Sequence, residues 1–188
     1  MQPRIDVQKL APTGYRAMAA LESHVRNSSR LEPSLLELVR MRASQINGCA
    51  YCLDMHSKDA RSAGESEQRL YALNAWRETP FFTERERAAL AWTEAITLIS
   101  SGHASDEVYE EVRQRFTEEE LVNLTLAIVA INGWNRNSRE PAIDKTSRTS
   151  PDVFQEVHSR PMATNGHSPI TTRTNPVSVG LRPICSSE

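Results

Sequence analysis

Cysteines and long apolar runs are both scarce in this sequence, and each shortage excludes a class of protein. Three cysteines among 188 residues cannot form the disulfide scaffold of a small secreted domain. No run of about 18 apolar residues is present, so no transmembrane helix is expected. Met1 to Leu10 contain no apolar core of signal-peptide length. We therefore expect a cytoplasmic protein that makes no contact with membranes.

An excess of charge of one sign is also missing. The 22 Lys and Arg residues nearly balance the 24 Asp and Glu residues, which leaves a formal net charge of −2. Because no basic cluster appears, a nucleic-acid partner is not expected. Apolar residues make up 39% of the chain, which is low for a fully packed protein and indicates that part of the length lies outside a core.

The two-residue alternation that is typical of strands is absent, whereas helical spacing of apolar residues recurs up to about residue 134. Capping-box patterns at Thr83 with Glu86 and at Thr117 with Glu120 indicate two helix starts. The sequence therefore predicts an all-α domain over residues 1–137. About seven helices are expected in it, near residues 13–28, 33–47, 49–63, 66–77 and 83–99, then a shorter one that begins near residue 105 and carries Val108 and Val112, and one over 117–134.

The composition changes after about residue 137. Six of the ten prolines lie beyond Arg139, Ser and Thr are abundant, Leu181 is the last segment's single leucine, and Phe154 is its single aromatic residue. Such a segment cannot bury enough apolar surface to offset the entropy lost on ordering. We expect residues 138–188 to form a disordered tail.

A pair of cysteines, Cys49 and Cys52, is followed four residues later by His56. On a helix these three positions share one face. Asn47-Gly48 indicates a helix break just before Cys49, so the pair would lie at a helix N-terminus, where unpaired N–H groups and the helix dipole favour a thiolate. His56 can accept the thiol proton of Cys52. The pattern predicts a redox-active dithiol.

This dithiol supports two kinds of chemistry. A Cys52 thiolate can attack a hydroperoxide and become a sulfenic acid, which Cys49 resolves into a disulfide that an external dithiol reduces. The same pair could instead exchange with the disulfide of another protein, without any peroxide.

Glu37 precedes Cys49 by twelve residues and belongs to the preceding expected helix. A helix-turn-helix could bring its carboxylate to His56, although a glutamate on such a helix is more often a solvated surface residue. Zinc is a competing interpretation of Cys-x-x-Cys, but His24 and His103 are isolated and no second cysteine pair supplies the remaining ligands. We therefore expect no metal and no cofactor.

The run from Glu37 to His56, with eleven residues between Glu37 and Cys49, resembles the alkylhydroperoxidase D-like branch of the carboxymuconolactone decarboxylase family. The resemblance covers roughly residues 10–136. It implies an all-helical fold assembled as a homo-oligomer, a trimer or a hexamer, and a proton relay of Glu37 and His56 that serves attack by Cys52. It also implies hydroperoxide as substrate and a dithiol, of the dihydrolipoyl type in the best-known branch, as reductant.

One position departs from that branch. Its best-known peroxidase has a second histidine between the cysteines, where this chain has Tyr51. A phenol with a pKa near 10 is a poor base at neutral pH, so the expected relay is shorter.

The sequence therefore favours a thiol-dependent peroxidase of antioxidant defence. A general thiol-disulfide oxidoreductase and a redox-sensing module are the alternatives. A carboxymuconolactone decarboxylase is a further alternative, against which the cysteine pair argues, because members of that branch generally lack it.

Overall fold

The computed structural model describes residues 6–137, and the tail expected over residues 138–188 lies outside them. The described residues form helices and no strand, which confirms the all-α prediction. In chain order the α-helices are α1 (Val7–Leu10), α2 (Pro12–Ser28), α3 (Pro33–Asn47), α4 (Ala50–Ser62), α5 (Glu67–Ala72), α6 (Glu84–Thr97), α7 (Ile99–Gly102), α8 (Asp106–Arg113) and α9 (Glu118–Asn137). A 3-10 helix, η1 (Leu73–Glu78), lies between α5 and α6.

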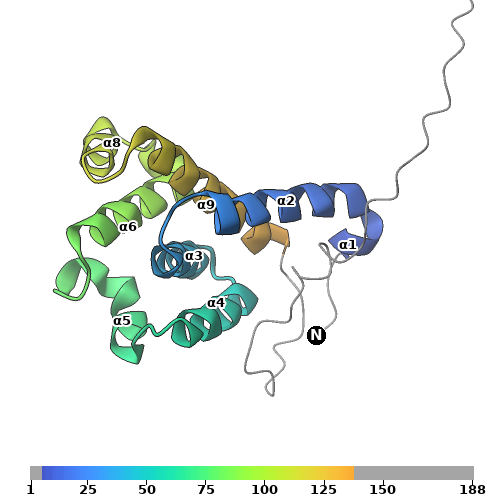
Figure 1. The fold of residues 1–188 in the computed structure, drawn as a ribbon, viewed down its shortest axis with the longest axis horizontal. Coiled ribbons are helices and arrows are strands. Elements are labelled where there is room, and N and C mark those ends of the chain that lie inside the picture. The colour runs from blue at the N-terminus through green and yellow to red at the C-terminus, as the bar shows by residue number, and fades with distance from the viewer. Residues whose placement is uncertain (1–5, 138–188) are drawn as a thin grey trace, which may run out of the picture.

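Helix α3 is the centre of this arrangement. It packs against α4, α6 and α9, which surround it in Figure 1, while α2 lies along α9. Nine of its fifteen residues are buried, so α3 carries little surface of its own. Pro33 stands in the first turn of α3, where its missing N–H is not needed. Gly48 follows α3 with φ +64°, a left-handed conformation that glycine adopts without steric cost.

The two expected capping boxes are confirmed. At the start of α6 the Thr83 hydroxyl accepts from the Glu86 N–H and the Glu86 carboxylate accepts from the Thr83 N–H. Thr117 and Glu120 make the same reciprocal pair before α9. Each box satisfies backbone donors that a helix start otherwise leaves without partners.

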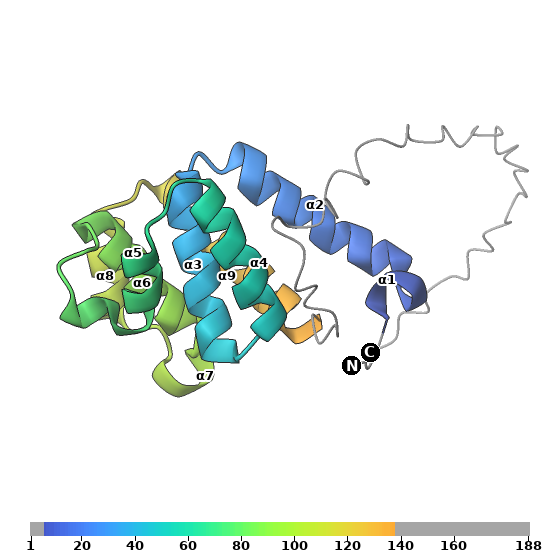
Figure 2. The same cartoon turned by 90° about the horizontal axis from the view of Figure 1, so that it is seen from below.

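The segment expected as one helix over residues 66–77 is divided into α5 and η1. The chain tightens into the 3-10 form at Leu73, and within η1 Ala75 departs from helical geometry with φ −117° and ψ 33°. The short helices α1 and α7, each of four residues, are additional to the sequence prediction. Helix α1 and the start of α2 project beyond the other helices in both views (Figures 1 and 2).

The main apolar core lies between α2, α3, α6, α8 and α9, and a second core joins α3 to α5, η1 and α6. A third, smaller cluster contains Cys49 and Cys52, packed with Ala43 of α3 and Ile131 of α9. This small cluster fixes the cysteine pair between three helices. Among the described residues, no helix has the length and apolar character needed to span a membrane.

Candidate active site

The cysteine pair lies at the N-terminus of α4, as the sequence predicts. Cys49 is the N-cap residue, and its Sγ accepts a hydrogen bond from the Cys52 N–H at 3.3 Å. Its own N–H donates to the carbonyl of Ser44 at 3.1 Å across the turn made by Gly48. The two sulfurs are joined in a disulfide. The helix start thus holds both sulfurs where backbone N–H groups and the helix dipole favour negative charge.

The disulfide is nearly closed off from solvent. Cys52 is 1% exposed and Cys49 is 7% exposed, so Cys49 is the more accessible half. Tyr51 and Trp134 are half-buried and pack against the cluster that contains both cysteines.

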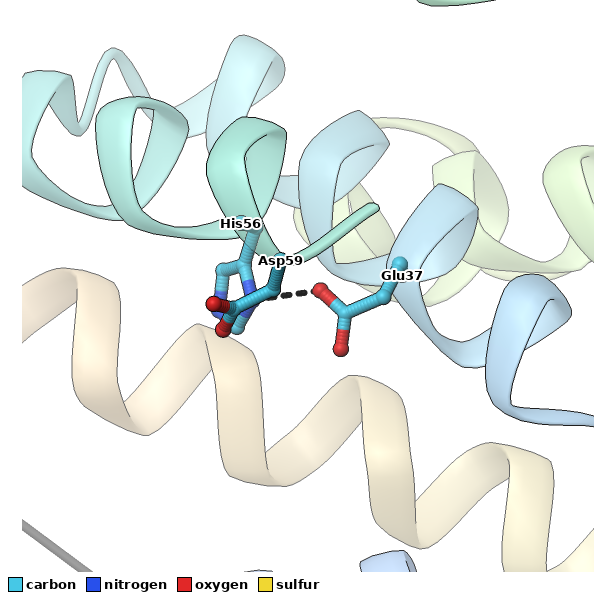
Figure 3. Close-up of side chains that lie close together, drawn as sticks. All are labelled: Glu37, His56 and Asp59. Atoms are coloured by element: carbon cyan, nitrogen blue, oxygen red, sulfur yellow. Dashed lines mark hydrogen bonds and ion pairs between the residues drawn. The ribbon is translucent and has the colours of Figure 1, made fainter. Parts of the chain in front are cut away.

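Glu37 of α3 and His56 of α4 form a buried pair. The distance from Glu37 Oε2 to His56 Nδ1 is 2.8 Å, and the dashed line in Figure 3 marks it. Glu37 is 7% exposed and His56 3% exposed. Glu37 is therefore not a solvated surface residue, although a glutamate on such a helix more often is. His56 lies one helical turn beyond Cys52 on the buried side of α4. The structure therefore joins Glu37 to His56 across α3 and α4 and places Cys52 one turn before His56, with Cys49 at the cap of the same helix.

Electrostatics keep Glu37 ionised. Burial raises its pKa, but the hydrogen bond from His56 and the charges of His56 and Arg40 outweigh burial and lower the pKa to about 2. A carboxylate only accepts hydrogen bonds, so Nδ1 of His56 carries the shared hydrogen. In the neutral ring Nε2 is then the nitrogen that can take up a proton.

Two charged residues, Arg40 and Glu22, extend the Glu37–His56 pair through hydrogen bonds, and the sequence analysis did not single them out. Arg40 of α3 donates through Nη1 to Glu37 Oε1 at 2.6 Å and through Nη2 to Glu22 Oε1 of α2 at 2.5 Å. Glu22 is 4% exposed and Arg40 3% exposed. A signal for Glu22 was present, because it stands three residues from both Ala19 and Val25 on the buried side of α2. An acid at such a position needs a buried partner.

Asp59 lies beside the pair, also from α4, and Figure 3 shows its carboxylate close to the His56 ring. Ligand atoms of Glu37, His56 and Asp59 lie within 4.8 Å of one another, a spacing that a metal ion could use. Both Glu37 oxygens are already engaged, Oε1 by Arg40 and Oε2 by His56. The guanidinium at Glu37 would repel a cation, so this arrangement suits proton transfer better than metal binding.

Amide side chains connect α9 to the turn before Cys49. Asn135 Nδ2 donates to Ser44 Oγ at 3.0 Å, and Asn47 Nδ2 donates to Asn135 Oδ1 at 2.9 Å. Asn47 also donates to Asn132 Oδ1 at 2.8 Å. Since Asn135 and Ser44 are buried, these bonds hold the end of α3 against α9 and so position the cysteine turn.

Comparisons with known proteins place the sequence in a family. The model of the "Carboxymuconolactone decarboxylase family" matches residues 12–95. The uncharacterized protein YdfG of Bacillus subtilis is 46% identical over 138 residues, which cover 73% of this chain and 93% of YdfG. YnjA of Escherichia coli, also uncharacterized, is 30% identical over 103 residues, which cover 55% of this chain and 56% of YnjA.

Two solved structures share the fold. A protein of unknown function from Agrobacterium tumefaciens, ATU0492, superimposes with a TM-score of 0.70 at 44% identity, covering 75% of this chain and 99% of that one. Its name proposes an antioxidant defence role of the AhpD kind. The debrominase Bmp8 superimposes with a TM-score of 0.60 at 25% identity, covering 66% of this chain and 67% of its own.

Proposed function

Since the chain belongs to the carboxymuconolactone decarboxylase family, we propose that it is a thiol-dependent peroxidase of antioxidant defence that cycles Cys49 and Cys52 between dithiol and disulfide. One observation carries the proposal: the Cys49–Cys52 disulfide lies at the start of α4, the helix that also carries the buried His56 and its Glu37 partner. A nucleophile, a resolving thiol and a supported base thus lie on one short segment.

In the proposed cycle His56 takes the thiol proton of Cys52, and the thiolate attacks the terminal oxygen of a hydroperoxide. The O–O bond breaks, the alkoxide leaves as an alcohol with the proton held by His56, and Cys52 becomes a sulfenic acid. Cys49 attacks the sulfenic sulfur, water leaves and the disulfide forms. One hydroperoxide is reduced to one alcohol and one water while two thiols are oxidised.

A dithiol of the dihydrolipoyl type closes the cycle by two exchange steps. The exposure of the two cysteine residues supports one direction. The incoming thiolate reaches Cys49, which is 7% exposed against 1% for Cys52, and Cys52 leaves as the thiolate. His56 lies one turn along the same helix, where a protonated ring can stabilise that thiolate.

In this proposal the protein acts in the cytoplasm as a homo-oligomer, either a trimer or a hexamer. Val122 and Val129 of α9 support self-association, because they are 60% and 50% exposed although α9 is otherwise a core helix. Native mass measurement of the full chain tests this, and a strictly monomeric mass contradicts it.

Peroxide consumption with dihydrolipoamide as reductant tests the activity. We expect the full-length protein to turn over, Cys52→Ser to be inactive, and Cys49→Ser to consume one equivalent and stop at the sulfenic acid. Cys185→Ser is the matched control, because it removes a thiol outside the pair, and it should retain full turnover. Equal activity of all four proteins rejects the proposal.

The main alternative is thiol-disulfide exchange without peroxide, which the short relay next to Tyr51 favours. It predicts that the protein reduces a disulfide substrate, such as a mixed glutathione disulfide, while hydrogen peroxide and organic hydroperoxides are left intact. Both assays use the same variants, so the two functions are separated directly.

A further inference from the structure

The Glu37–His56 pair is one end of a longer buried series of charges. Glu22 on α2 binds Arg40 on α3, Arg40 binds Glu37, and Glu37 binds His56 on α4. All four side chains are buried. The proposed reaction uses Glu37 and His56 but assigns no role to Glu22 or Arg40.

The charges of these four groups balance in only one protonation state of His56. Two carboxylates and one guanidinium carry a net charge of −1 when His56 is neutral and of zero when it is protonated. An unbalanced charge in a buried site is costly, whereas a balanced and hydrogen-bonded set is tolerated. These four groups are therefore electrically neutral together only when His56 carries a proton.

Glu22 decides this balance although its hydrogen bond goes to Arg40 and not to His56. Without Glu22, Arg40 and Glu37 cancel each other, and a proton on His56 would create a buried positive charge. Without Arg40, no cation would offset the two carboxylates, and their negative charge would hold the proton on His56 more strongly. The two residues thus act on His56 with opposite signs.

We propose that Glu22 and Arg40 are positioning residues that set the proton affinity of His56. Arg40 fixes Glu37 through Oε1, so that Oε2 points at the imidazole, and Glu22 offsets the guanidinium charge that would otherwise weaken the hold of Glu37 on the proton. The role of His56 in activating the Cys52 thiol rests on the proposed function, but the charge balance among the four groups does not.

Other charged groups near these helices have partners of their own or face water. Asp59 is partly buried and lies within 4.8 Å of His56 and Glu37, and its negative charge is the same in every variant compared below. On α2, His24 binds Asn123 of α9. The remaining pairs lie toward the surface or the helix ends: Asp54 with Lys58, Arg61 with Glu67, Arg42 with Glu94, Glu119 with Arg30, Glu120 with Arg85, and Arg136 with Asn132.

The test is a pH titration of the His56 ring by NMR in the full-length, disulfide-bonded protein, with the signal assigned by a His56→Gln variant. We expect Glu22→Gln to lower the proton affinity of His56 by less than the roughly tenfold or larger change that a charge in direct contact produces, because Glu22 lies beyond Arg40. Arg40→Met should raise the affinity, and the double variant should return toward the wild type. Glu119→Gln, which removes an exposed partner of Arg30, is the matched control and should leave the titration unchanged.

Opposite shifts that cancel in the double variant cannot come from a general loosening of the fold. If Arg40→Met does not fold, Arg40→Lys replaces it: this variant keeps the charge and should titrate within twofold of the wild type, while Glu22→Gln still shifts. An unchanged His56 titration in folded Glu22→Gln overturns the proposal, and so do shifts of equal sign in Glu22→Gln and Arg40→Met.

A second measurement separates this proposal from the proposed function. The pH dependence of Cys52 alkylation in the reduced protein should follow the His56 titration through the same variants. Shifted His56 titrations with unchanged alkylation would leave the charge balance standing and remove thiol activation from the proposed function.

Discussion

Arg40 and Arg85 are two of the arginines that bridge a pair of glutamates within residues 6–137, and Arg40 lies inside the molecule whereas Arg85 lies nearer its surface. Arg40 binds Glu22 and Glu37 with its side chain 3% exposed. Arg85, at the start of α6, makes the same kind of bridge with its side chain 27% exposed. The chemical groups are alike, so burial is the main difference between the two bridges.

The surface bridge connects helix ends. Arg85 binds Glu32 before α3 at 3.1 Å and Glu120 in the first turn of α9 at 2.6 Å, and its guanidinium lies 3.9 Å from the centre of the Phe116 ring. Water screens these charges, so each pair contributes little to stability and can be exchanged without consequence for the site.

The buried bridge has no water to compensate an unbalanced charge. Arg40 therefore has to be matched by its two carboxylates, and a change in any one of them changes the state of the others. Arg85 therefore serves as a surface contact, whereas Arg40 is joined through Glu37 to His56 of the candidate site.

The largest expected effect comes from removing each arginine. Arg40→Met leaves two buried carboxylates facing each other and should lower the free energy of unfolding by about 3–5 kcal/mol. Arg85→Met loses screened ion pairs and a ring contact and should cost about 1 kcal/mol. Urea unfolding of the disulfide-bonded variants measures both. Equal losses would mean that burial does not distinguish the two bridges.

The next largest effect should come from lowering the pH, which should change the unfolding free energy of the buried bridge more than that of the surface bridge. The pKa of Glu37 is lowered from 4.5 to about 2, so its contribution to stability is complete above pH 4.5 and is lost as the pH falls through 2. The linked free energy is on the order of 3 kcal/mol. Glu37→Gln should therefore flatten the fall in unfolding free energy between pH 5 and pH 2.

Glu120→Gln is the matched control for this acid series. The hydrogen bond from the Thr117 backbone and the contact with Arg85 outweigh burial and lower the pKa of Glu120, so the sign of its pH dependence is the same. Because Glu120 is near solvent, its effect should be much smaller. A pH profile of Glu37→Gln that is parallel to the wild type would show that Glu37 is not the group being titrated.

The smallest expected effect is the difference in salt dependence between the coupling energies of the two bridges. In double-mutant cycles the coupling of Arg85 with Glu120 should be below about 1 kcal/mol and should fall further in 1 M NaCl. The coupling of Arg40 with Glu22 should be larger and nearly independent of salt, because ions do not reach a buried pair. A salt-sensitive Arg40–Glu22 coupling would show that water enters the buried series.

Local features were predictable because their causes lie within a few residues. The capping boxes at Thr83 and Thr117 and the helix break at Gly48 follow from backbone donors and a left-handed turn, and the structure confirms them. The division between α5 and η1 at Leu73 was missed, because the change from α-helical to 3-10 hydrogen bonding has no signal in residue type. Helical spacing predicts that a helix exists better than it predicts where the helix tightens.

The sequence by itself determined the all-α class and the place of Cys49 and Cys52 at a helix start with His56 on the same face, because spacing within one helix decides these relations. Only the tertiary structure decided that Glu37 is buried against His56 and that Arg40 and Glu22 extend the pair. Glu22 is 18 residues from Arg40, and Glu37 is 19 from His56. Whether such groups meet depends on how α2, α3 and α4 pack, because the same glutamates on a solvent-facing side would only have met water.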